Sequence, residues 1–256
     1  MRNTVFTIIL LLGFLTTHAE EYKSQTFKAL NGVNLPYKYL PAPKDGGKYP
    51  LVVFLHGVDE RGNDNVKQLT HGGAVFANDS LRRRFPAMVI FPQCPVSTFW
   101  AYQKDPKLGI GLSLPAKSEQ TPVEEALKAL IDACATMPNI DPARIYLVGV
   151  SMGGMAVFDL AARYPNYFAA AVPICGSISA GRLGGKSQTA WRIFHGASDK
   201  LVPPTGSRRA KAELEKAGTK VEYIEYPKVG HGVWYKVFER PDFMEWMFKQ
   251  RLNAKQ

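Results

Sequence analysis

Short, almost continuously apolar runs recur along the sequence and are separated by longer segments with helical patterning. Runs of this kind are typical of parallel strands that are buried on both faces, because the helices connecting them cover the sheet on each side. The runs are 49–57, 87–93, 144–150, 169–175, 191–196 and 221–227. Strands that alternate with helices predict a doubly wound, mostly parallel sheet of the α/β class.

The clearest helix between two of these strands is predicted over residues 121–137. Thr121 and Glu124 have the spacing of a capping box, and Pro122 stands at the first helical position, where a proline is well tolerated. Further helices are expected at 151–165, 207–218 and 241–252.

Two alternating segments, 24–30 and 33–40, precede the first buried run. The dipeptide Asn31-Gly32 joins them and favours a tight turn, since both residues tolerate positive φ. We therefore expect an N-terminal antiparallel hairpin beside the parallel sheet. The sequence shows no internal repeat, so residues 20–256 are predicted to form a single domain without a large cap. Its longest irregular segment is 97–120.

The first 19 residues have the pattern of a secretory signal peptide. Arg2 precedes an apolar run over 5–15, and Thr17 and Ala19 are small residues at the spacing that a signal peptidase accepts. The alternative is an uncleaved anchor, but the run is shorter than the roughly 20 residues that a membrane span needs. We expect cleavage after Ala19, export to the periplasm or beyond the cell, and no stable membrane insertion.

Charge and cysteine content limit the other classes of function. The formal net charge is +10, but the charges are scattered and Arg82–Arg84 is the one tight cluster, so we expect no nucleic-acid partner.

No pair of residues has a ligand spacing such as CxxC or HExxH, so no metal or cofactor is expected. Cys94, Cys134 and Cys175 permit several single bridges, and the sequence does not choose among them.

Residues 149–153, Gly-Val-Ser-Met-Gly, form a GxSxG motif between a predicted strand and a predicted helix. A sharp turn at this place puts the serine at the carboxyl edge of the sheet, and its flanking glycines avoid collisions with neighbouring backbone. The positive end of the helix dipole then points at charge that develops beside Ser151. Ser151 is therefore the predicted nucleophile.

A serine hydroxyl needs a base within hydrogen-bond reach, and in this kind of site the chain order is serine, acid, histidine. Two histidines follow Ser151, namely His195 and His231. His195 comes at the end of a predicted strand, whereas His231 lies between two glycines in the loop after the last strand. His231 is the predicted base.

Asp199 is the predicted acid, because it follows the run 191–196 on a loop where catalytic groups of open α/β sheets gather. Asp159 lies within the helix after the nucleophile and would face away from it. Glu222 and Glu225 alternate on a strand and are expected to be surface or cross-strand residues.

Acyl transfer also needs hydrogen-bond donors for the oxyanion, each worth about 2.7 to 4 kcal/mol. The backbone N–H of Met152, directly after the nucleophile, is one predicted donor. The other is the N–H of Val58, just past the pair His56-Gly57 that ends a strand. His56 itself is interpreted as structural.

Four segments together resemble the exported phospholipase/carboxylesterase and feruloyl or acetylxylan esterase-like branch of the α/β-hydrolase superfamily. They are FLHGVDERGNDN, GVSMGGMAVFDLAARYPNYFAAAVPICG, HGASDKLVP and GHGVW. The resemblance implies the α/β-hydrolase fold, the same triad, and hydrolysis through an acyl-enzyme of feruloyl or acetyl esters on plant polysaccharide or on a small acylated molecule. Many relatives have Gly or Ala where this chain has Val58, which implies a narrower pocket.

The resemblance also implies that Glu60, Arg61 and Asn65 form a loop, which we interpret as a scaffold for the oxyanion turn. Trp100 and Trp234 are candidate substrate-binding residues that would wall an aromatic or sugar pocket.

Two other functions remain open. A peptidase of the prolyl oligopeptidase kind shares this catalytic domain, but such enzymes usually carry a large extra domain for which this chain has no room. A secreted carbohydrate-binding protein that kept the fold without catalysis is the other alternative. The oligomeric state is not predicted.

Overall fold

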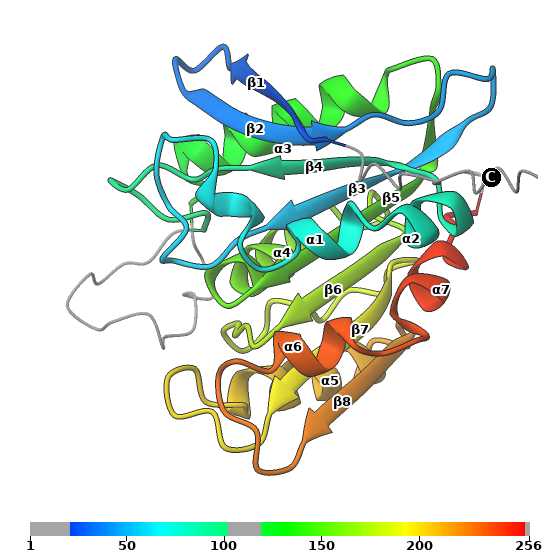
Figure 1. Ribbon diagram of the computed structural model, residues 1–256. Coiled ribbons are helices and arrows are strands. Elements are labelled where there is room, and N and C mark those ends of the chain that lie inside the picture. The colour runs from blue at the N-terminus through cyan, green and yellow to red at the C-terminus, as the bar shows by residue number, and fades with distance from the viewer. Residues whose placement is uncertain (1–20, 102–118, 254–256) are drawn as a thin grey trace, which may run out of the picture.

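The computed structural model describes residues 21–101 and 119–253. The predicted signal peptide, residues 1–19, and most of the irregular segment 97–120 lie outside the described residues. An eight-stranded sheet runs through the described part in the order β1-β2-β4-β3-β5-β6-β7-β8, with helices on both of its faces (Figure 1).

The strands agree closely with the predicted runs. Their bounds are β1 Lys23–Lys28, β2 Asn34–Leu40, β3 Tyr49–Leu55, β4 Met88–Pro92, β5 Ile140–Val150, β6 Ala170–Ile174, β7 Ala190–Gly196 and β8 Val221–Tyr226. The pairs β1-β2 and β2-β4 are antiparallel, and the other neighbours are parallel. The predicted fold class, a mostly parallel sheet with an N-terminal hairpin, is confirmed.

Strand β3 shows how the apolar runs build two cores. Successive strand residues point to opposite faces, so Val53 and Leu55 join one apolar cluster while Val52 and Phe54 join the other. Helices α3 (Pro122–Ala135), α4 (Met152–Arg163) and α5 (Thr205–Lys216) cover the first face. The second face carries α1 (Gly73–Phe76), α2 (Asp79–Arg84), α6 (Trp234–Phe238) and α7 (Phe243–Phe248) (Figure 1).

The predicted N-cap and first-turn proline of the long α3 helix are confirmed, but the capping box is not completed, because the Glu124 carboxylate lies 3.4 Å from Arg163 Nε instead of reaching back to the Thr121 N–H. Thr121 caps the helix by accepting a hydrogen bond of 3.1 Å from the N–H of Glu124, and Pro122 occupies the first turn. The helices α1, α2 and α6 and the short 3-10 helix η1 (Lys67–Leu69) are absent from the prediction. They have at most six residues each, which is too short for a helical period to show in the sequence.

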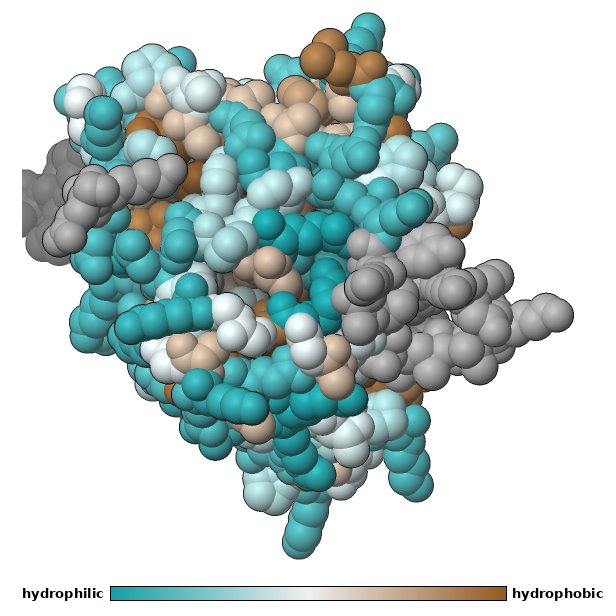
Figure 2. All heavy atoms as spheres, turned by 180° about the vertical axis from the view of Figure 1, so that it is seen from behind, coloured by the Kyte–Doolittle hydropathy of each residue, from teal (hydrophilic) through white to brown (hydrophobic). Residues whose placement is uncertain are grey.

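The outer surface over α3, α4 and α5 is largely hydrophilic, with small and separate hydrophobic areas (Figure 2). Among the described helices, none has the length and apolar character needed to cross a membrane.

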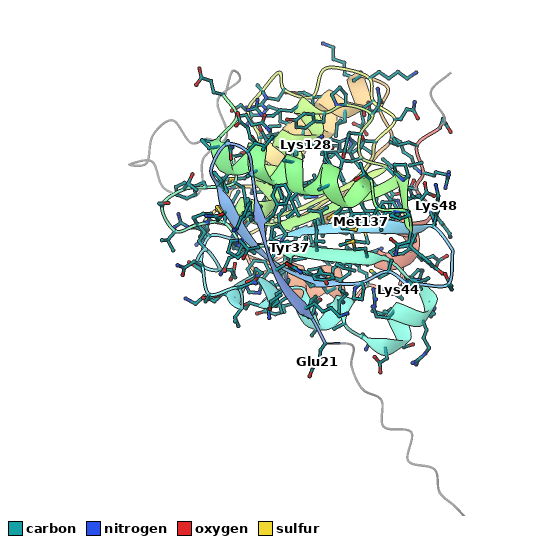
Figure 3. All side chains as sticks on the ribbon, turned by 90° about the horizontal axis from the view of Figure 1, so that it is seen from above. Glu21, Tyr37, Lys44, Lys48, Lys128 and Met137 are labelled. Atoms are coloured by element: carbon teal, nitrogen blue, oxygen red, sulfur yellow. The ribbon has the colours of Figure 1, made fainter. Side chains whose placement is uncertain are left out.

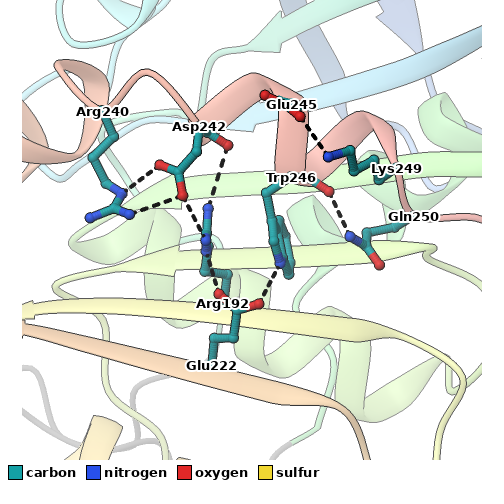
Figure 4. A network of polar contacts seen from close by, with 8 residues as sticks. All are labelled: Arg192, Glu222, Arg240, Asp242, Glu245, Trp246, Lys249 and Gln250. Atoms are coloured by element: carbon teal, nitrogen blue, oxygen red, sulfur yellow. Dashed lines mark hydrogen bonds and ion pairs between the residues drawn. The ribbon is translucent and has the colours of Figure 1, made fainter.

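A polar network fastens α7 to the sheet (Figure 4). Arg192 on β7 donates to Glu222 on β8 at 2.8 Å and to Asp242 at 2.9 Å. Trp246 on α7 donates its Nε1–H to the other oxygen of Glu222 at 2.8 Å. Arg240 completes the network by donating to Asp242 at 2.9 Å.

Strand register brings the ends of the parallel strands to one edge. Leu55 at the end of β3 pairs with Gly149, and Gly196 at the end of β7 pairs with Tyr226. In the sheet, β3 lies between β4 and β5. The chain therefore adds β4 on one side of β3 and then crosses over to add β5 on the other side. Ligands of open α/β sheets bind outside the carboxyl ends of strands at such a point.

Candidate active site

Ser151, His231 and Asp199 lie on three loops at this edge and form a continuous hydrogen-bonded chain. His231 Nδ1 is 2.7 Å from Asp199 Oδ2, and His231 Nε2 is 2.8 Å from Ser151 Oγ. A nitrogen that faces a carboxylate must carry the hydrogen, so Nδ1 donates to Asp199 and Nε2 is left to accept from the serine hydroxyl. The structure therefore brings together the residues predicted as nucleophile, base and acid.

The backbone of Ser151 is held in a sparsely populated conformation, with φ 54° and ψ −116°, between β5 and α4. Such a conformation costs about 1 to 3 kcal/mol for a residue other than glycine. A Cβ on Gly153 would lie 2.0 Å from the carbonyl oxygen of Leu55, so only glycine lets α4 begin this close to β3. The Ser151 N–H donates to the Ile174 oxygen at 2.8 Å, which anchors the turn to β6.

The loop after β8 places His231 against the end of β7. A Cβ on Gly196 would lie 2.3 Å from the carbonyl oxygen of Gly230, so this close approach requires glycine. Ser198 N–H also donates to the Val229 oxygen at 2.9 Å, which ties the acid loop to the histidine loop. The ring of Trp234 packs edge-on against His231, with the ring centroids 5.7 Å apart.

The side chain of Asp199 is fully buried and its oxygens are well supplied with donors. Oδ1 accepts from the N–H groups of Leu201 and Val202, each at 2.9 Å. Burial alone would raise the pKa of Asp199, but hydrogen bonds from His195, His231 and the Val202 N–H outweigh it and lower this pKa. Asp199 is therefore a carboxylate that can orient His231.

His195 is a second histidine at the acid, and sequence reasoning missed this contact. Its ring is fully buried, and Nε2 lies 3.3 Å from Asp199 Oδ2 and 2.8 Å from the Val202 oxygen. Because both of these neighbours only accept, Nε2 must carry a hydrogen and donate. Nδ1 is 2.8 Å from Ser207 Oγ on α5. The only sign of this contact in the sequence is that His195 and Asp199 are four residues apart, with a turn between them.

Both predicted oxyanion donors lie beside Ser151. Met152 opens α4, so its N–H is one of the first four in the helix, which have no acceptor within the helix. A Cβ on Gly57 would lie 3.7 Å from the Cβ of Ser151, which shows that the segment leading to Val58 passes next to the nucleophile.

The loop after β3 has the contacts expected of a scaffold for Val58. Arg61 donates to the Val58 oxygen at 3.0 Å and to the Thr98 oxygen at 3.0 Å. Asn65 adopts a positive φ of 53°, and its N–H donates to Gln93 at 2.7 Å. These bonds fix the turn that carries the predicted oxyanion donor.

His56 is buried within the protein and has no access to Ser151 chemistry. Its Nδ1 donates to the Gly57 oxygen at 2.6 Å, and its Nε2 accepts from the Cys94 N–H at 2.9 Å. Burial lowers the pKa of His56 to about 4, so the ring is neutral near pH 7. These contacts agree with the structural role predicted for His56.

A hollow of about 70 Å³ lies beside Ser151, and Val58 and Trp234 are among the residues that line it. Trp234 therefore lies at the site, and its role in substrate binding stays a prediction. Trp100 is not a wall of this hollow, and its expected role in substrate binding needs correction. Its side chain is fully enclosed in the core and donates its Nε1–H to the His56 oxygen at 3.3 Å.

The arrangement of possible metal ligands and the surroundings of the three cysteines can be described for residues 21–101 and 119–253. No group of three or more His, Cys, Asp or Glu side chains there is arranged to hold a metal ion. Cys94, Cys134 and Cys175 are all buried and form no disulfide with one another. Burial raises the pKa of the Cys134 thiol to about 12, which disfavours the reactive thiolate.

Residues 38–239 match the family model of the dienelactone hydrolase family. The chain belongs to the dienelactone hydrolase family. It is 24% identical over 227 residues to a probable carboxylesterase, SOBER1-like, from Arabidopsis thaliana, with 82% of each chain covered.

Solved structures support the same fold. One is described as a thermostable esterase and is 33% identical, with a TM-score of 0.77; the alignment covers 91% of this chain and 64% of that one. A CE1 ferulic acid esterase from Anaeromyces mucronatus, solved in complex with ferulic acid, is 13% identical with a TM-score of 0.60 over 90% of each chain, which shows the fold alone. By family and by these relatives, the chain is a serine ester hydrolase.

Proposed function

We propose that the chain hydrolyses carboxylic esters through an acyl-enzyme, with Ser151 as nucleophile, His231 as general base and Asp199 as the acid that orients it. The observation that carries this proposal is the hydrogen-bonded chain from Asp199 through His231 to Ser151, with bonds of 2.7 and 2.8 Å. Each member has the neighbour that its role requires.

In the first half of the reaction, His231 takes the proton of Ser151 as Oγ attacks the ester carbonyl. The N–H groups of Met152 and Val58 stabilise the oxyanion that forms. The bond between the carbonyl carbon and the alcohol oxygen then breaks, and His231 gives its proton to that oxygen. The alcohol leaves and the acyl group remains on Ser151.

In the second half, His231 takes a proton from water as the water oxygen attacks the acyl-enzyme. The bond from the acyl carbon to Ser151 Oγ breaks, and the proton returns to Ser151. The carboxylic acid leaves, so one ester and one water give one acid and one alcohol.

For the substrate, we propose acetyl or feruloyl esters of plant polysaccharide or of small acylated molecules. The small hollow beside Ser151, narrowed by Val58, suits an acetyl group, whereas a feruloyl group has to extend beyond it. A ferulic acid esterase of the same fold supports the aromatic alternative. The signal pattern of residues 1–19 supports export of the enzyme.

The test compares residues 20–256 with the Ser151→Ala variant on p-nitrophenyl acetate and butyrate, methyl ferulate and acetylated xylan. We expect turnover by the wild-type protein and its loss in the variant, with unchanged circular dichroism as the control for folding. The ranking of ferulate against acetate identifies the acyl group. A peptide p-nitroanilide, included in the panel, detects a peptidase. Equal activity of the variant and the wild type would overturn the assignment of Ser151.

Export is tested by expressing the full chain with a C-terminal tag and measuring the mass of the tagged protein in periplasm and medium. We expect a chain that begins at Glu20. A full-length protein that remains with the cytoplasmic fraction would contradict export.

A further inference from the structure

A mainly apolar groove of about 330 Å³ lies between the η1–α1 segment and α6. Ala74 and Val75 of α1 form one wall, and Trp234 and Phe238 of α6 form the other. Tyr235 stands at the rim with 63% of its surface exposed, which is unusual for a large aromatic side chain that only fills a core.

This groove adjoins the hollow beside Ser151. His71 and Trp234 line both spaces, and their ring centroids are 4.6 Å apart. His71 is held in place by Glu60, whose Oε1 lies 3.1 Å from His71 Nε2. Trp234 in turn packs against the ring of His231. The two rings therefore form a shared wall between the groove and the candidate active site.

The hollow beside Ser151 is much smaller than the groove. Its volume of about 70 Å³ compares with about 330 Å³ for the groove, so it encloses only part of a larger ester. Any larger group has to extend out of it. The groove behind His71 and Trp234 borders this hollow, because both spaces are lined by these two residues.

The proton transfer by His231 indicates whether the acyl half or the alcohol half of the ester approaches this wall. His231 has to give its proton to the alcohol oxygen, so that oxygen must come within hydrogen-bond distance of His231 Nε2. The carbonyl oxygen instead faces the N–H groups of Val58 and Met152. The groove shares Trp234 with the hollow, and Trp234 packs against His231, so the groove lies next to the residue that the alcohol oxygen has to approach.

We propose that the groove over α1 and α6 binds an apolar chain or ring of the alcohol half of the ester. This inference rests on the proposed function, because it takes Ser151 and His231 as nucleophile and base. Burial of apolar carbon atoms from water favours binding, so an alcohol that fills the groove should be strongly preferred.

Two isomeric esters test which half is bound. Hexyl acetate carries a six-carbon chain on the alcohol, and methyl heptanoate carries the same chain on the acyl group. Acid release in a pH-stat gives kcat/KM for both, with methyl acetate as the reference. We expect hexyl acetate to exceed methyl heptanoate by about tenfold or more.

Two variants then address the groove itself. Ala74 is exposed, so Ala74→Trp fills the groove without disturbing the core and should lower the ratio of kcat/KM for hexyl acetate over methyl acetate about tenfold. Tyr235→Ala removes the rim and should lower the same ratio severalfold. Met137→Trp is the matched control, because Met137 follows α3 on the opposite side of the sheet from α1 (Figure 3), and it should leave the ratio unchanged.

The outcomes separate this inference from the proposed function. No hydrolysis of methyl acetate or of any ester in the panel that tests the proposed function would refute that function itself. Hydrolysis with equal rates for the two isomers, or with a preference for methyl heptanoate, would overturn the assignment of the groove to the alcohol half alone. A ratio that Ala74→Trp and Met137→Trp change equally would also overturn it.

Discussion

Strand β7 carries a polar network near each of its ends, and the two networks differ in what they do. Near the amino end, Arg192 connects β7 to Glu222 and to Asp242 before α7 (Figure 4). At the carboxyl end, His195 contacts Asp199 in the loop that follows.

The Arg192 network is closed and its charges are balanced. The guanidinium lies between two carboxylates, and Arg240 and Trp246 donate to the same carboxylates. Every strong donor in this set has a strong acceptor, so the network holds α7 against β7 and β8 and has no group left to react.

The Asp199 network is directional. His231 and two backbone N–H groups donate to one buried carboxylate, and the His195 Nε2–H, which donates to the Val202 oxygen, lies 3.3 Å from it. The chain then leads outward through His231 to the hydroxyl of Ser151. A balanced network thus stabilises the fold, whereas a network that ends on a single hydroxyl polarises that hydroxyl.

The largest expected effect is that of Asp199→Asn on activity. The side-chain amide of asparagine can donate to Nδ1 of His231 and so favour the tautomer that cannot accept the Ser151 proton. We expect kcat for p-nitrophenyl acetate to fall about 10⁴-fold. A loss of less than tenfold would show that Asp199 does not orient the base.

Replacing His195 tests whether the second donor to Asp199 matters for catalysis. His195→Ala removes an N–H that lies 3.3 Å from Asp199 Oδ2 while donating to the Val202 oxygen. We expect kcat to fall severalfold with little change in KM, because the carboxylate that orients His231 loses the electrostatic support of this N–H. His195→Gln keeps a donor and should recover part of the loss. Equal kcat in the wild type and His195→Ala would mean that His195 acts on stability alone.

Arg192→Met should reverse this pattern by lowering stability and sparing kcat. The Arg192 side chain is 8% exposed, but Glu222 and Asp242 are 40% and 39% exposed, so water can solvate the carboxylates once the guanidinium is gone. We expect a loss of about 1 to 2 kcal/mol in the free energy of unfolding, seen as a Tm lower by about 2 to 8 °C. A tenfold drop in kcat would show instead that the two ends of β7 are coupled.

The smallest effect is a pH-dependent one at Asp242. Arg240 and Arg192 outweigh burial and lower the pKa of Asp242. A carboxyl whose pKa is lower in the folded than in the unfolded chain stabilises the fold above its ordinary pKa of about 3.9, and this stabilisation is lost as the pH falls through the lowered value.

Asp242→Asn should therefore cost under about 1 kcal/mol at pH 7, and the difference from the wild type should shrink as the pH falls below about 4. Urea unfolding of both proteins at pH 7 and at acid pH measures it. A difference that grows toward acid pH would contradict the sign of this shift.

The local sequence pattern was sufficient to predict that Ser151 lies at a turn between a strand and a helix. It was also sufficient to select Asp199 and His231 as the acid and the base that follow it along the chain. The reason is that a buried parallel strand, a glycine-bounded turn and a capped helix each leave a signal within a few neighbouring residues. The hairpin at Asn31-Gly32 and the cap of α3 at Thr121 were readable for the same reason.

Contacts between distant segments left no such signal. Trp100 and Trp234 look alike in the sequence, yet Trp100 is enclosed by the core and Trp234 lines the hollow beside Ser151. His195 meets Asp199 in the loop that follows β7, and Glu60 contacts His71 within the connection from β3 to α1. Contacts made by the folding of an irregular loop leave no periodic signal either. Whether a side chain is buried, paired or open to substrate depends on which remote residues surround it, and that is settled by packing of the folded chain and not by local periodicity.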